Sequence, residues 1–482
     1  MTKKYLPKSA EAPAADPSRR VLTSPPLEIH LSRSADRFEC IQIKEPELLF
    51  GRNHRCVDPR TGLAAYGPYS NAVEGSRNQL RVGIIGTGEA IEKTLSLLHE
   101  ISRPIEQDPN VDNILYPSFP GLNSGAPFSI DVISQPSWHK SVSREALRLA
   151  EECGDPTTKF GLLRDLYGTQ VDAMSGLEFA PNVVICPTSA PMDRSLLIAA
   201  CGKSIPIEIV SDGKWPESNG GRKNKAAEAW NLSVRLLYKA GFASWRLADA
   251  RGDTCFVGIA FYPDAEHAST SIWTSCAHNV TDLGEGFVLR GDTFERDSLK
   301  GAHEIPHLER DQAAKLMSRI LETYAEKVGS LPRKVVVHKT SHFTEAERLG
   351  FEDSLGGINQ HSLVSVSKTG AFFLRPGRKP VFRGAAIPLG EKLGLVYLSG
   401  YIPFLRCHPG NRIPQPFEIT ENWGSLAFGE AAKDLLRLTK LNWTTSDFCT
   451  EVPITLADFG HARDIFRILG KQDIVLDDRG YL

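Results

Sequence analysis

Two polar side chains on one predicted helix, Asn231 and Lys239, have types and spacing that could hold a charged ligand. They are eight residues apart, about two helical turns, so they lie along one side of the helix. The lysine offers a positive charge and the asparagine offers an amide. Alternatively, Lys239 only extends from the helix end into solvent. Gly241 follows, where helices commonly end, and the apolar run 255–260 then predicts a central strand.

The loop 211–225, SDGKWPESNGGRKNK, supplies a second group of cations. They either contact a phosphate backbone or are simply solvated, and the sequence leaves both open. These cations are Lys214, Arg222, Lys223 and Lys225. A glycine-rich turn within 81–90, RVGIIGTGEA, could also seat a phosphate at a helix N-terminus. Ile91 stands where GxGxxG needs its third glycine, so a plain strand-to-helix turn is the favoured interpretation.

Motifs of two common enzyme classes are missing from the chain, which contains no GxSxG or Walker A pattern. His338 and His342 follow a predicted strand, so their spacing of four does not put them on one helical face. The nine cysteines form no CxxC pair, and we interpret them as reduced thiols of a cytoplasmic protein. Because 56 basic residues nearly balance 58 acidic ones, any nucleic-acid site must be local.

Strand-like and helix-like segments alternate along most of the 482 residues, which predicts two or three domains built on largely parallel sheets. We expect a disordered leader at 1–26, strands and a linker at 27–80, a first α/β unit at 81–250 and a second at 251–482. The leader lacks the apolar core of a signal peptide. No apolar run approaches the roughly 20 residues of a membrane span, so we expect no membrane contact.

The predicted elements of the two units follow from apolar runs and their period. In the first unit we expect strands at 128–133, 182–186 and 205–210, and helices at 143–153 and 193–202. In the second we expect strands at 255–261, 271–275, 334–338, 361–367 and 395–399, and helices at 311–328, 345–350 and 430–439. Earlier in the chain, two strands are expected at 27–31 and 38–43. The Gly- and Pro-rich segment 45–70 predicts a structured loop with few regular elements.

Several motifs occur in a specific order: Asn-x7-Lys-x-Gly from Asn231 to Gly241, a Trp-Arg-Leu turn at 245–247, and a Gly-Ile strand at 258–259. Before them comes LFG…DPR.GL..YGPY, and after them LTKLNWTT at 438–445. Together they resemble the MID and PIWI domains of Argonautes, and the closest likeness is to short prokaryotic Argonautes. The resemblance covers about 45–482. It implies an α/β fold with a Rossmann-like MID domain packed on a ribonuclease-H-like PIWI domain.

The same resemblance implies where a nuclease site would lie. In the family, clustered carboxylates hold two divalent cations that activate water and stabilise the leaving oxygen. Their first two positions correspond to Ala260 and Thr340, neither of which has a carboxylate. The last ligand corresponds to His461, or alternatively to Asp458. One ligand of three cannot hold two metal ions, so we expect no cleavage of a target.

The resemblance also implies a site for the 5′-phosphate of a guide strand. Asn231 and Lys239 match the second half of the family's binding motif. In the first half, Leu197 and Glu208 stand where a lysine and a glutamine are expected. A carboxylate beside a phosphate is unfavourable unless a cation intervenes, so this half departs from the family.

Three further residues are expected near that site. Lys203 or Lys223 would replace the missing lysine. The terminal carboxylate of Leu482 would help to hold a Mg²⁺ at the guide phosphate, unless the chain end is frayed. Other cations are expected to line a nucleic-acid channel through contacts with the backbone. They are Lys339, Lys368, Arg375, Arg378, Lys379, Arg383 and Lys440.

The function implied by the resemblance is guide-RNA-directed recognition of target single-stranded DNA by a nuclease-inactive protein. Short Argonautes of this class pair with an APAZ-containing effector, which is a TIR or sirtuin-like NADase, or a nuclease. Target binding would then activate the effector in cytoplasmic defence against plasmids or phages. One alternative is a metal-dependent guided nuclease whose rearranged carboxylate site recruits Asp264 or Glu266. Another is a small-molecule-binding α/β protein that uses the GIIGTGEA turn.

Overall fold

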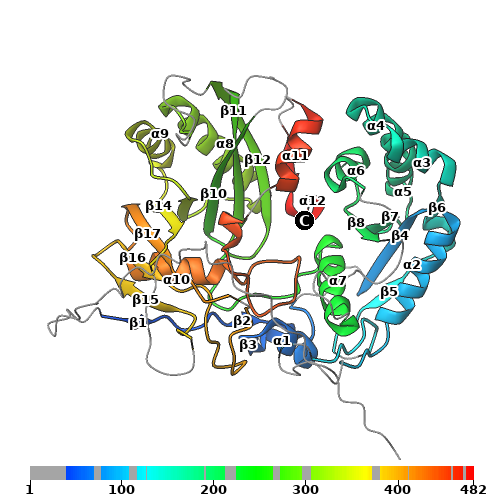
Figure 1. Cartoon of the computed structure of the whole chain (residues 1–482), viewed down its shortest axis with the longest axis horizontal. Coiled ribbons are helices and arrows are strands. Elements are labelled where there is room, and N and C mark those ends of the chain that lie inside the picture. Colours follow the sequence, from blue (N-terminus) through cyan, green and yellow to red (C-terminus); the bar gives the residue numbers. More distant parts are fainter. Residues whose placement is uncertain are drawn as a thin grey trace, which may run out of the picture. The chain divides into compact units, whose positions relative to one another are not determined.

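Short apolar strands build a parallel sheet in the first half of the chain. In this computed structural model the strand order is β5-β4-β7-β8, and β6 pairs with the far end of β4 (Figure 1). The strands are β4 (Gln79–Gly86), β5 (Asp131–Ile133), β6 (His139–Ser141), β7 (Val183–Thr188) and β8 (Ile207–Ser211). All residues of β7 are buried, as expected where helices cover both faces of a parallel sheet.

Helices connect these strands and include several that the sequence did not predict. The elements are α2 (Gly88–Ile101), η2 (Pro136–Trp138), α3 (Arg144–Glu152), α4 (Pro156–Leu163), a π-helical turn η3 (Arg164–Gly168), α5 (Thr169–Ser175), α6 (Arg194–Cys201) and α7 (Lys225–Lys239). The predicted helices at 143–153 and 193–202 are confirmed as α3 and α6. The continuous α4–η3–α5 run was missed.

Strands of the second half of the chain, together with β1 from near its start, form a ten-stranded mixed sheet with the order β1-β15-β16-β17-β14-β13-β10-β11-β12-β18. Its strands are β1 (Ile41–Gln42), β10 (Thr254–Pro263), β11 (Ile272–Thr281), β12 (Gly286–Glu295), β13 (Lys334–Lys339), β14 (Gln360–Lys368), β15 (Ala385–Pro388), β16 (Gly394–Val396), β17 (Phe417–Gly424) and β18 (Val475–Asp477). An antiparallel β10–β11–β12 meander is followed by β13 and β14, which run parallel to β10. The hairpin partner β12 was not predicted.

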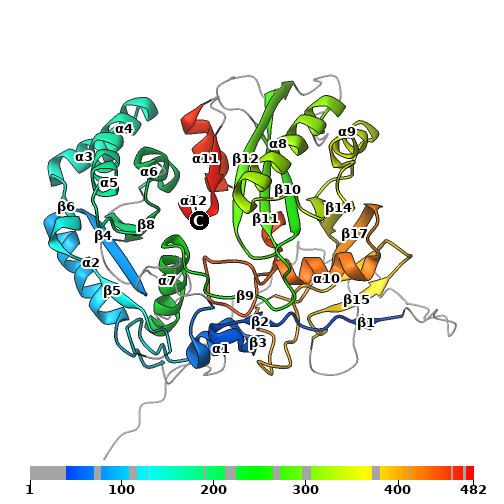
Figure 2. The ribbon, with the colours of Figure 1, turned by 180° about the vertical axis from the view of Figure 1, so that it is seen from behind.

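Further helical elements accompany this sheet (Figure 2). They are α8 (Arg310–Val328), α9 (Glu345–Leu355), α10 (Phe428–Leu438), η4 (Ile454–Leu456), α11 (Gly460–Leu469) and α12 (Asp478–Tyr481). A core of buried side chains joins α8 and α9 to β10 and β13, including Val257, Val337, Leu316 and Phe351. In the described part of the chain, no helix is long and apolar enough to span a membrane.

The segment 45–70 is more regular than its composition predicted. It contains β2 (Leu48–Leu49), η1 (Gly51–Asn53), β3 (Arg55–Cys56) and α1 (Pro59–Tyr66), and β2 pairs with β9 (Arg246–Leu247). The expectation of few regular elements was wrong because Asp58 caps α1, accepting a hydrogen bond from the Thr61 amide at 2.8 Å. Pro59 occupies the first helical position, where its missing N–H costs nothing.

The structure describes residues 39–69, 78–107, 115, 117–125, 127–188, 192–202, 204–211, 224–263, 272–295, 306–371, 380–410, 412–457, 460–470 and 474–481. Residues from Cys40 onward form one compact unit. The predicted leader, the strand 27–31 and several predicted site residues lie outside the described residues. Those site residues are Lys203, Lys214, Arg222, Lys223, Asp264, Glu266, Arg375, Arg378, Lys379, Asp458 and Leu482.

Candidate nucleic-acid interface

Helix α7 positions Asn231 and Lys239 as predicted. Asn224 caps its first turn, accepting from the Ala227 amide at 3.2 Å. One side of α7 is buried against the core through residues such as Trp230 and Leu237. Asn231 and Lys239 lie along another side, with Arg235 between them at the i+4 position.

A cluster of three cations surrounds the buried carboxylate of Glu208, a residue of β8. Arg235 Nε donates to Glu208 Oε1 at 2.7 Å, and Lys239 Nζ lies 3.4 Å from Oε2. Arg194, at the start of α6, approaches the same oxygen to 3.9 Å. Lys239 also donates to the Ile207 carbonyl at 2.7 Å. Three positive groups around one carboxylate leave an excess of positive charge at this end of α7.

The electrostatics of the cluster follow from its burial. Burial alone would raise the pKa of Glu208, but the nearby charges of Arg235, Lys239 and Arg194 outweigh it and hold that pKa below its ordinary value. Burial lowers the pKa of Lys239 to about 8, against the opposing attraction of Glu208. The carboxylate is therefore charged at neutral pH. A carboxylate at position 208 is unfavourable for phosphate binding unless cations offset its charge. The fold places three such cations beside it.

Asn231 contacts the segment that follows LTKLNW. Its side-chain oxygen accepts from the Ser446 amide at 2.9 Å and from the Ser446 hydroxyl at 2.8 Å. Arg235 reaches the same segment, with Nη1 3.5 Å from the Thr444 carbonyl oxygen. This face of α7 thus joins the parallel sheet to the second half of the chain. Asn231 and Lys239 have structural roles in addition to any ligand contact.

The structure brings Ala260 and Thr340 together. Strands β10 and β13 are parallel with Ile259 beside Lys339, so Ala260 and Thr340 each come next in the chain at the same end of the two strands. Thr340 is the first residue after β13. Neither side chain can bind a metal ion as a carboxylate does. In the described part of the chain, no group of three or more His, Cys, Asp or Glu side chains could hold a metal ion.

The turn η4 packs on β10 and β13. His338 Nδ1 lies 3.0 Å from Thr455 Oγ1, and burial lowers the pKa of His338 to about 4, so the imidazole is neutral. A Cβ on Gly258 would lie 1.8 Å from the Thr455 carbonyl oxygen, so only glycine allows this approach. His461, the predicted last ligand, lies at the start of α11 with its Nδ1 3.2 Å from Ser195 Oγ of α6.

Lys339 does not line a channel, and that prediction was wrong. Its side chain is 1% exposed, and its Nζ donates to both Glu347 oxygens at 2.6 and 2.8 Å. His307 Nδ1 lies 3.0 Å from the same carboxylate. Burial would raise the pKa of Glu347, but hydrogen bonds from His307 and Lys339 together with the Lys339 charge lower it to about 2. Lys339 is a structural ion-pair partner on the α8–α9 face.

The channel prediction was also wrong for Lys440. Its Nζ is buried, donates to the Val57 and Phe448 carbonyl oxygens at 2.9 and 2.7 Å, and lies 2.9 Å from Glu45 Oε1. Arg383 is buried beside it and also pairs with Glu45, at 2.9 Å. These two cations anchor the N-terminal segment onto the second half of the chain. Neither is available to a phosphate backbone.

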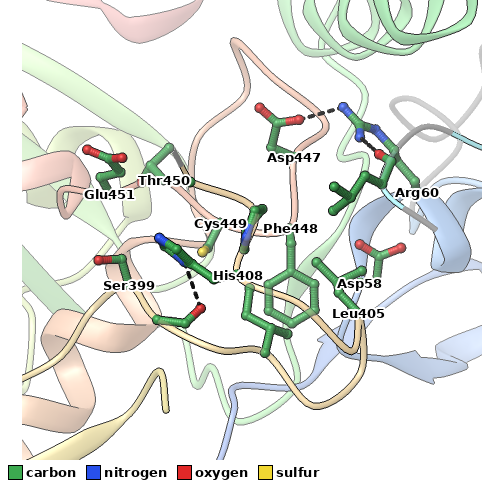
Figure 3. A pocket seen from close by; sticks show the side chains of 15 residues that line it. Asp58, Arg60, Ser399, Leu405, His408, Asp447, Phe448, Cys449, Thr450 and Glu451 are labelled. Carbon is green, nitrogen blue, oxygen red and sulfur yellow. Dashed lines mark hydrogen bonds and ion pairs between the residues drawn. The ribbon is translucent and has the colours of Figure 1, made fainter. Parts of the chain in front are cut away.

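A cavity of about 220 Å³ lies beside the LTKLNWTT segment (Figure 3). Arg60 of α1 closes one side, donating to Asp447 at 2.5 Å and to the Leu115 carbonyl at 2.6 Å. His408 and Glu451 line the other side. The guanidinium of Arg60 is occupied by these bonds and the lining carries three carboxylates. We therefore assign no phosphate site here.

The predicted Mg²⁺ does not fit the described residues near Lys239. The carboxylate of Glu208 is held by three cations, whose charge disfavours a divalent cation. The carboxylate of Leu482 lies outside the described residues. The chain before it is not frayed, because Tyr481 is 3% exposed and α12 contacts α6 and α7.

The sequence did not identify Arg194 and Arg235 as site residues. Arg235 could have been found, because it lies four residues from both Asn231 and Lys239 on the same helical face. Arg194 carries no such signal, since its approach to Glu208 depends on how α6 packs against β8.

Comparison with solved structures identifies the architecture. An Argonaute from Clostridium butyricum, solved with a guide DNA and a 19-mer target DNA, matches 92% of this chain with a TM-score of 0.62 and 15% identity. The fold is Argonaute-like. An Aquifex aeolicus Argonaute matches 92% of the chain at a TM-score of 0.55 and 14% identity. A Marinitoga piezophila Argonaute in complex with a 5′-hydroxyl guide RNA matches 88% at 0.54 and 12%.

The Argonaute-like fold confirms the predicted pair of Rossmann-like and ribonuclease-H-like units. The chain covers 55% of the Clostridium and Aquifex proteins and 59% of the Marinitoga protein, so it spans little more than half of their length. No protein-family model matches the sequence, and no curated protein matches it significantly. The likeness therefore rests on the three-dimensional arrangement.

Proposed function

We propose that this protein binds a guide strand and uses it to recognise a complementary nucleic acid without cutting it. The observation that carries this proposal is the cluster of Arg194, Arg235 and Lys239 around Glu208, within an Argonaute-like fold. Two of the similar proteins were solved with guide strands. Three cations for one carboxylate leave positive charge for a guide 5′-phosphate, and Asn231 offers its amide to the terminal nucleotide.

Cleavage is not part of the proposal, because the β10–β13 edge carries Ala260 and Thr340 where a two-metal site needs carboxylates. We propose that catalysis resides in an APAZ-containing partner, a TIR or sirtuin-like NADase or a nuclease, that target binding activates. The guide is RNA and the target is single-stranded DNA in this proposal. The support for partner, strand types and cytoplasmic defence role is the resemblance to short prokaryotic Argonautes.

Guide binding tests the proposal most directly. Filter binding would compare one RNA carrying a 5′-phosphate with the same RNA carrying a 5′-hydroxyl. We expect the wild-type protein to prefer the phosphate at least about 10-fold, and Arg235→Gln to lose most of that preference. Arg333→Gln is the matched control, because Arg333 is exposed and far along the chain from α7. Equal affinity of wild type for both strands would contradict the phosphate site.

Two further assays separate the alternatives. Nucleic acid extracted from the purified protein should be short RNA, whereas a copurified nucleotide would favour a small-molecule-binding protein. Labelled target DNA should remain intact when incubated with guide, protein and Mg²⁺ or Mn²⁺. Metal-dependent cleavage would instead support a guided nuclease with a rearranged carboxylate site.

A further inference from the structure

The side chain of Asn231 is held in one orientation by the segment 444–447 of the second half of the chain. Its oxygen Oδ1 lies 2.9 Å from the backbone nitrogen of Ser446, and a backbone N–H can only donate. The amide atom that faces Ser446 is therefore the oxygen and not the nitrogen, a choice that a contact with a hydroxyl alone would leave open. The Thr445 hydroxyl lies 3.3 Å from the same oxygen.

Arg60 of α1 fixes the direction of the Ser446 hydroxyl. Its Nε lies 2.9 Å from Ser446 Oγ and can only donate, so the serine oxygen accepts there. The single hydrogen of that hydroxyl is then directed to Asn231 Oδ1, 2.8 Å away. The guanidinium of Arg60 is itself held by Asp447 and by the Leu115 carbonyl (Figure 3). Arg60 and Ser446 are 6% and 0% exposed, so water does not compete for these hydrogen bonds.

The NH₂ group of Asn231 lies on the other branch of the amide. It has no hydrogen bond within the described part of the chain, and the residue is half-buried. An amide NH₂ can donate two hydrogen bonds and accepts none. The group that Asn231 presents to a ligand is therefore a donor, about one helical turn from Arg235 and two from Lys239.

We propose that Arg60 and Ser446 are positioning residues, which orient Asn231 so that it recognises a hydrogen-bond acceptor on the terminal nucleotide of the guide. This role rests on the proposed function, to which it adds the kind of group that Asn231 reads. Turning the amide over would set its NH₂ against the Ser446 N–H, so two donors would face each other. The orientation is thus fixed before a guide arrives, and binding does not have to restrict this side chain further.

Substitutions of Asn231 test the orientation of its amide without any guide. Asn231→Asp keeps an oxygen opposite the Ser446 donors, whereas Asn231→Ala removes it. We expect Asn231→Asp to unfold at the urea concentration of the wild type, and Asn231→Ala and Ser446→Ala to unfold at lower ones. The variant with both alanines should lose less stability than the sum of the two single losses, because they share one hydrogen bond. If Asn231→Asp loses as much stability as Asn231→Ala, the amide nitrogen faces Ser446 and the proposal is overturned.

Filter binding of one 5′-phosphorylated RNA tests the recognition itself. Asn231→Asp replaces the donor by an acceptor, so it should bind the RNA at least about 10-fold more weakly than Asn231→Ala. Ser446→Ala should bind it about 5-fold or more weakly than the wild type, and should add no loss to that of Asn231→Ala.

Ser365→Ala is the matched control, because Ser365 of β14 is also buried and its hydroxyl donates to the Ser341 carbonyl at 2.9 Å. It should lose stability and keep the RNA affinity of the wild type. If the wild type binds RNA and Ser446→Ala binds it as tightly, or if Asn231→Asp binds it no more weakly than Asn231→Ala, the positioning role is overturned while guide binding stands. A wild type that binds no RNA contradicts the proposed function instead, and the urea measurements still decide how Asn231 is oriented.

Discussion

Replacing Glu208 by glutamine should make the protein less stable and yet a better binder of phosphorylated guides. The carboxylate is 1% exposed and faces Arg235, Lys239 and Arg194 at 2.7, 3.4 and 3.9 Å. Removing one partner of a buried ion pair costs about 3 to 5 kcal/mol. The two arginines are 18% and 28% exposed, so water partly replaces the lost carboxylate. We therefore expect Glu208→Gln to lower the free energy of unfolding by about 3 kcal/mol.

The gain in affinity comes from removing a repulsion. A phosphate bound through the same cations would lie about 6 Å from the carboxylate, and two like charges at that distance repel by about 3 kcal/mol in a partly buried site. Without that repulsion, the affinity for a 5′-phosphorylated guide should rise roughly 10- to 100-fold. The affinity for a 5′-hydroxyl guide should change little. Guide binding should also restore much of the lost thermal stability.

Filter binding with the two guides and urea unfolding without guide provide the two measurements. Glu347→Gln is the matched control, because Glu347 is also 1% exposed and paired with a buried lysine, Lys339, at 2.6 Å. It should lose comparable stability and keep the wild-type guide affinities. If Glu208→Gln leaves the ratio of the two affinities unchanged or lowers it, the phosphate does not bind at this cluster and the reasoning fails.

Three other predictions follow from the described contacts. Since the pKa of Lys239 is about 8, preference for a 5′-phosphorylated guide should fall as pH rises from 7 to 9, and a preference that stays constant in filter binding would contradict this. Because the pKa of Glu347 is about 2 and its ordinary value is 4.5, its stabilising effect is present above pH 4.5 and is lost as pH falls toward 2. Glu347→Gln should therefore reduce the pH dependence of the urea midpoint between pH 5 and 3. A variant whose urea midpoint changes with pH as much as that of the wild type would contradict this role of Glu347. Gly258→Ala should cost about 1 to 3 kcal/mol in urea unfolding by displacing Thr455, while Gly429→Ala, with no atom within 4 Å of its added Cβ, should be neutral or stabilising.

The fold could be predicted where local patterns and tertiary packing agree. The apolar residues of α7 recur at helical spacing, β10 contains a continuous apolar run, and Gly241 follows the helix. Both elements occur as expected. Strand β12 was missed because its apolar run is only three residues long and is followed by arginine, glycine and aspartate, so its pairing with β11 decides its conformation. Helix α1 was missed although Asp58 and Pro59 form a recognisable helix start.

The candidate site was harder to predict because charge in a sequence does not reveal burial. Lys339 and Lys440 were assigned to a surface channel on the usual expectation that lysines are exposed. Their partners Glu347 and Glu45 are set by the tertiary fold, and Glu45 lies almost the whole chain away from Lys440. For Glu208 the sequence showed the carboxylate but not the cations around it. The packing of α6 and α7 places those cations beside Glu208, which the sequence alone did not predict.

The pairing of Glu45 with Arg383 also constrains how the protein is made. The two residues are 338 positions apart. At roughly 5 to 20 residues per second, a ribosome needs about 20 to 70 s to synthesise the intervening chain. During that time β1 has no β15 to pair with, and the carboxylate of Glu45 has neither of its buried cations. The parallel sheet β4–β8 has all its strands within Gln79–Ser211 and can form first. The backbone groups of β1 in the nascent chain therefore remain unpaired until the last third of the protein has been synthesised.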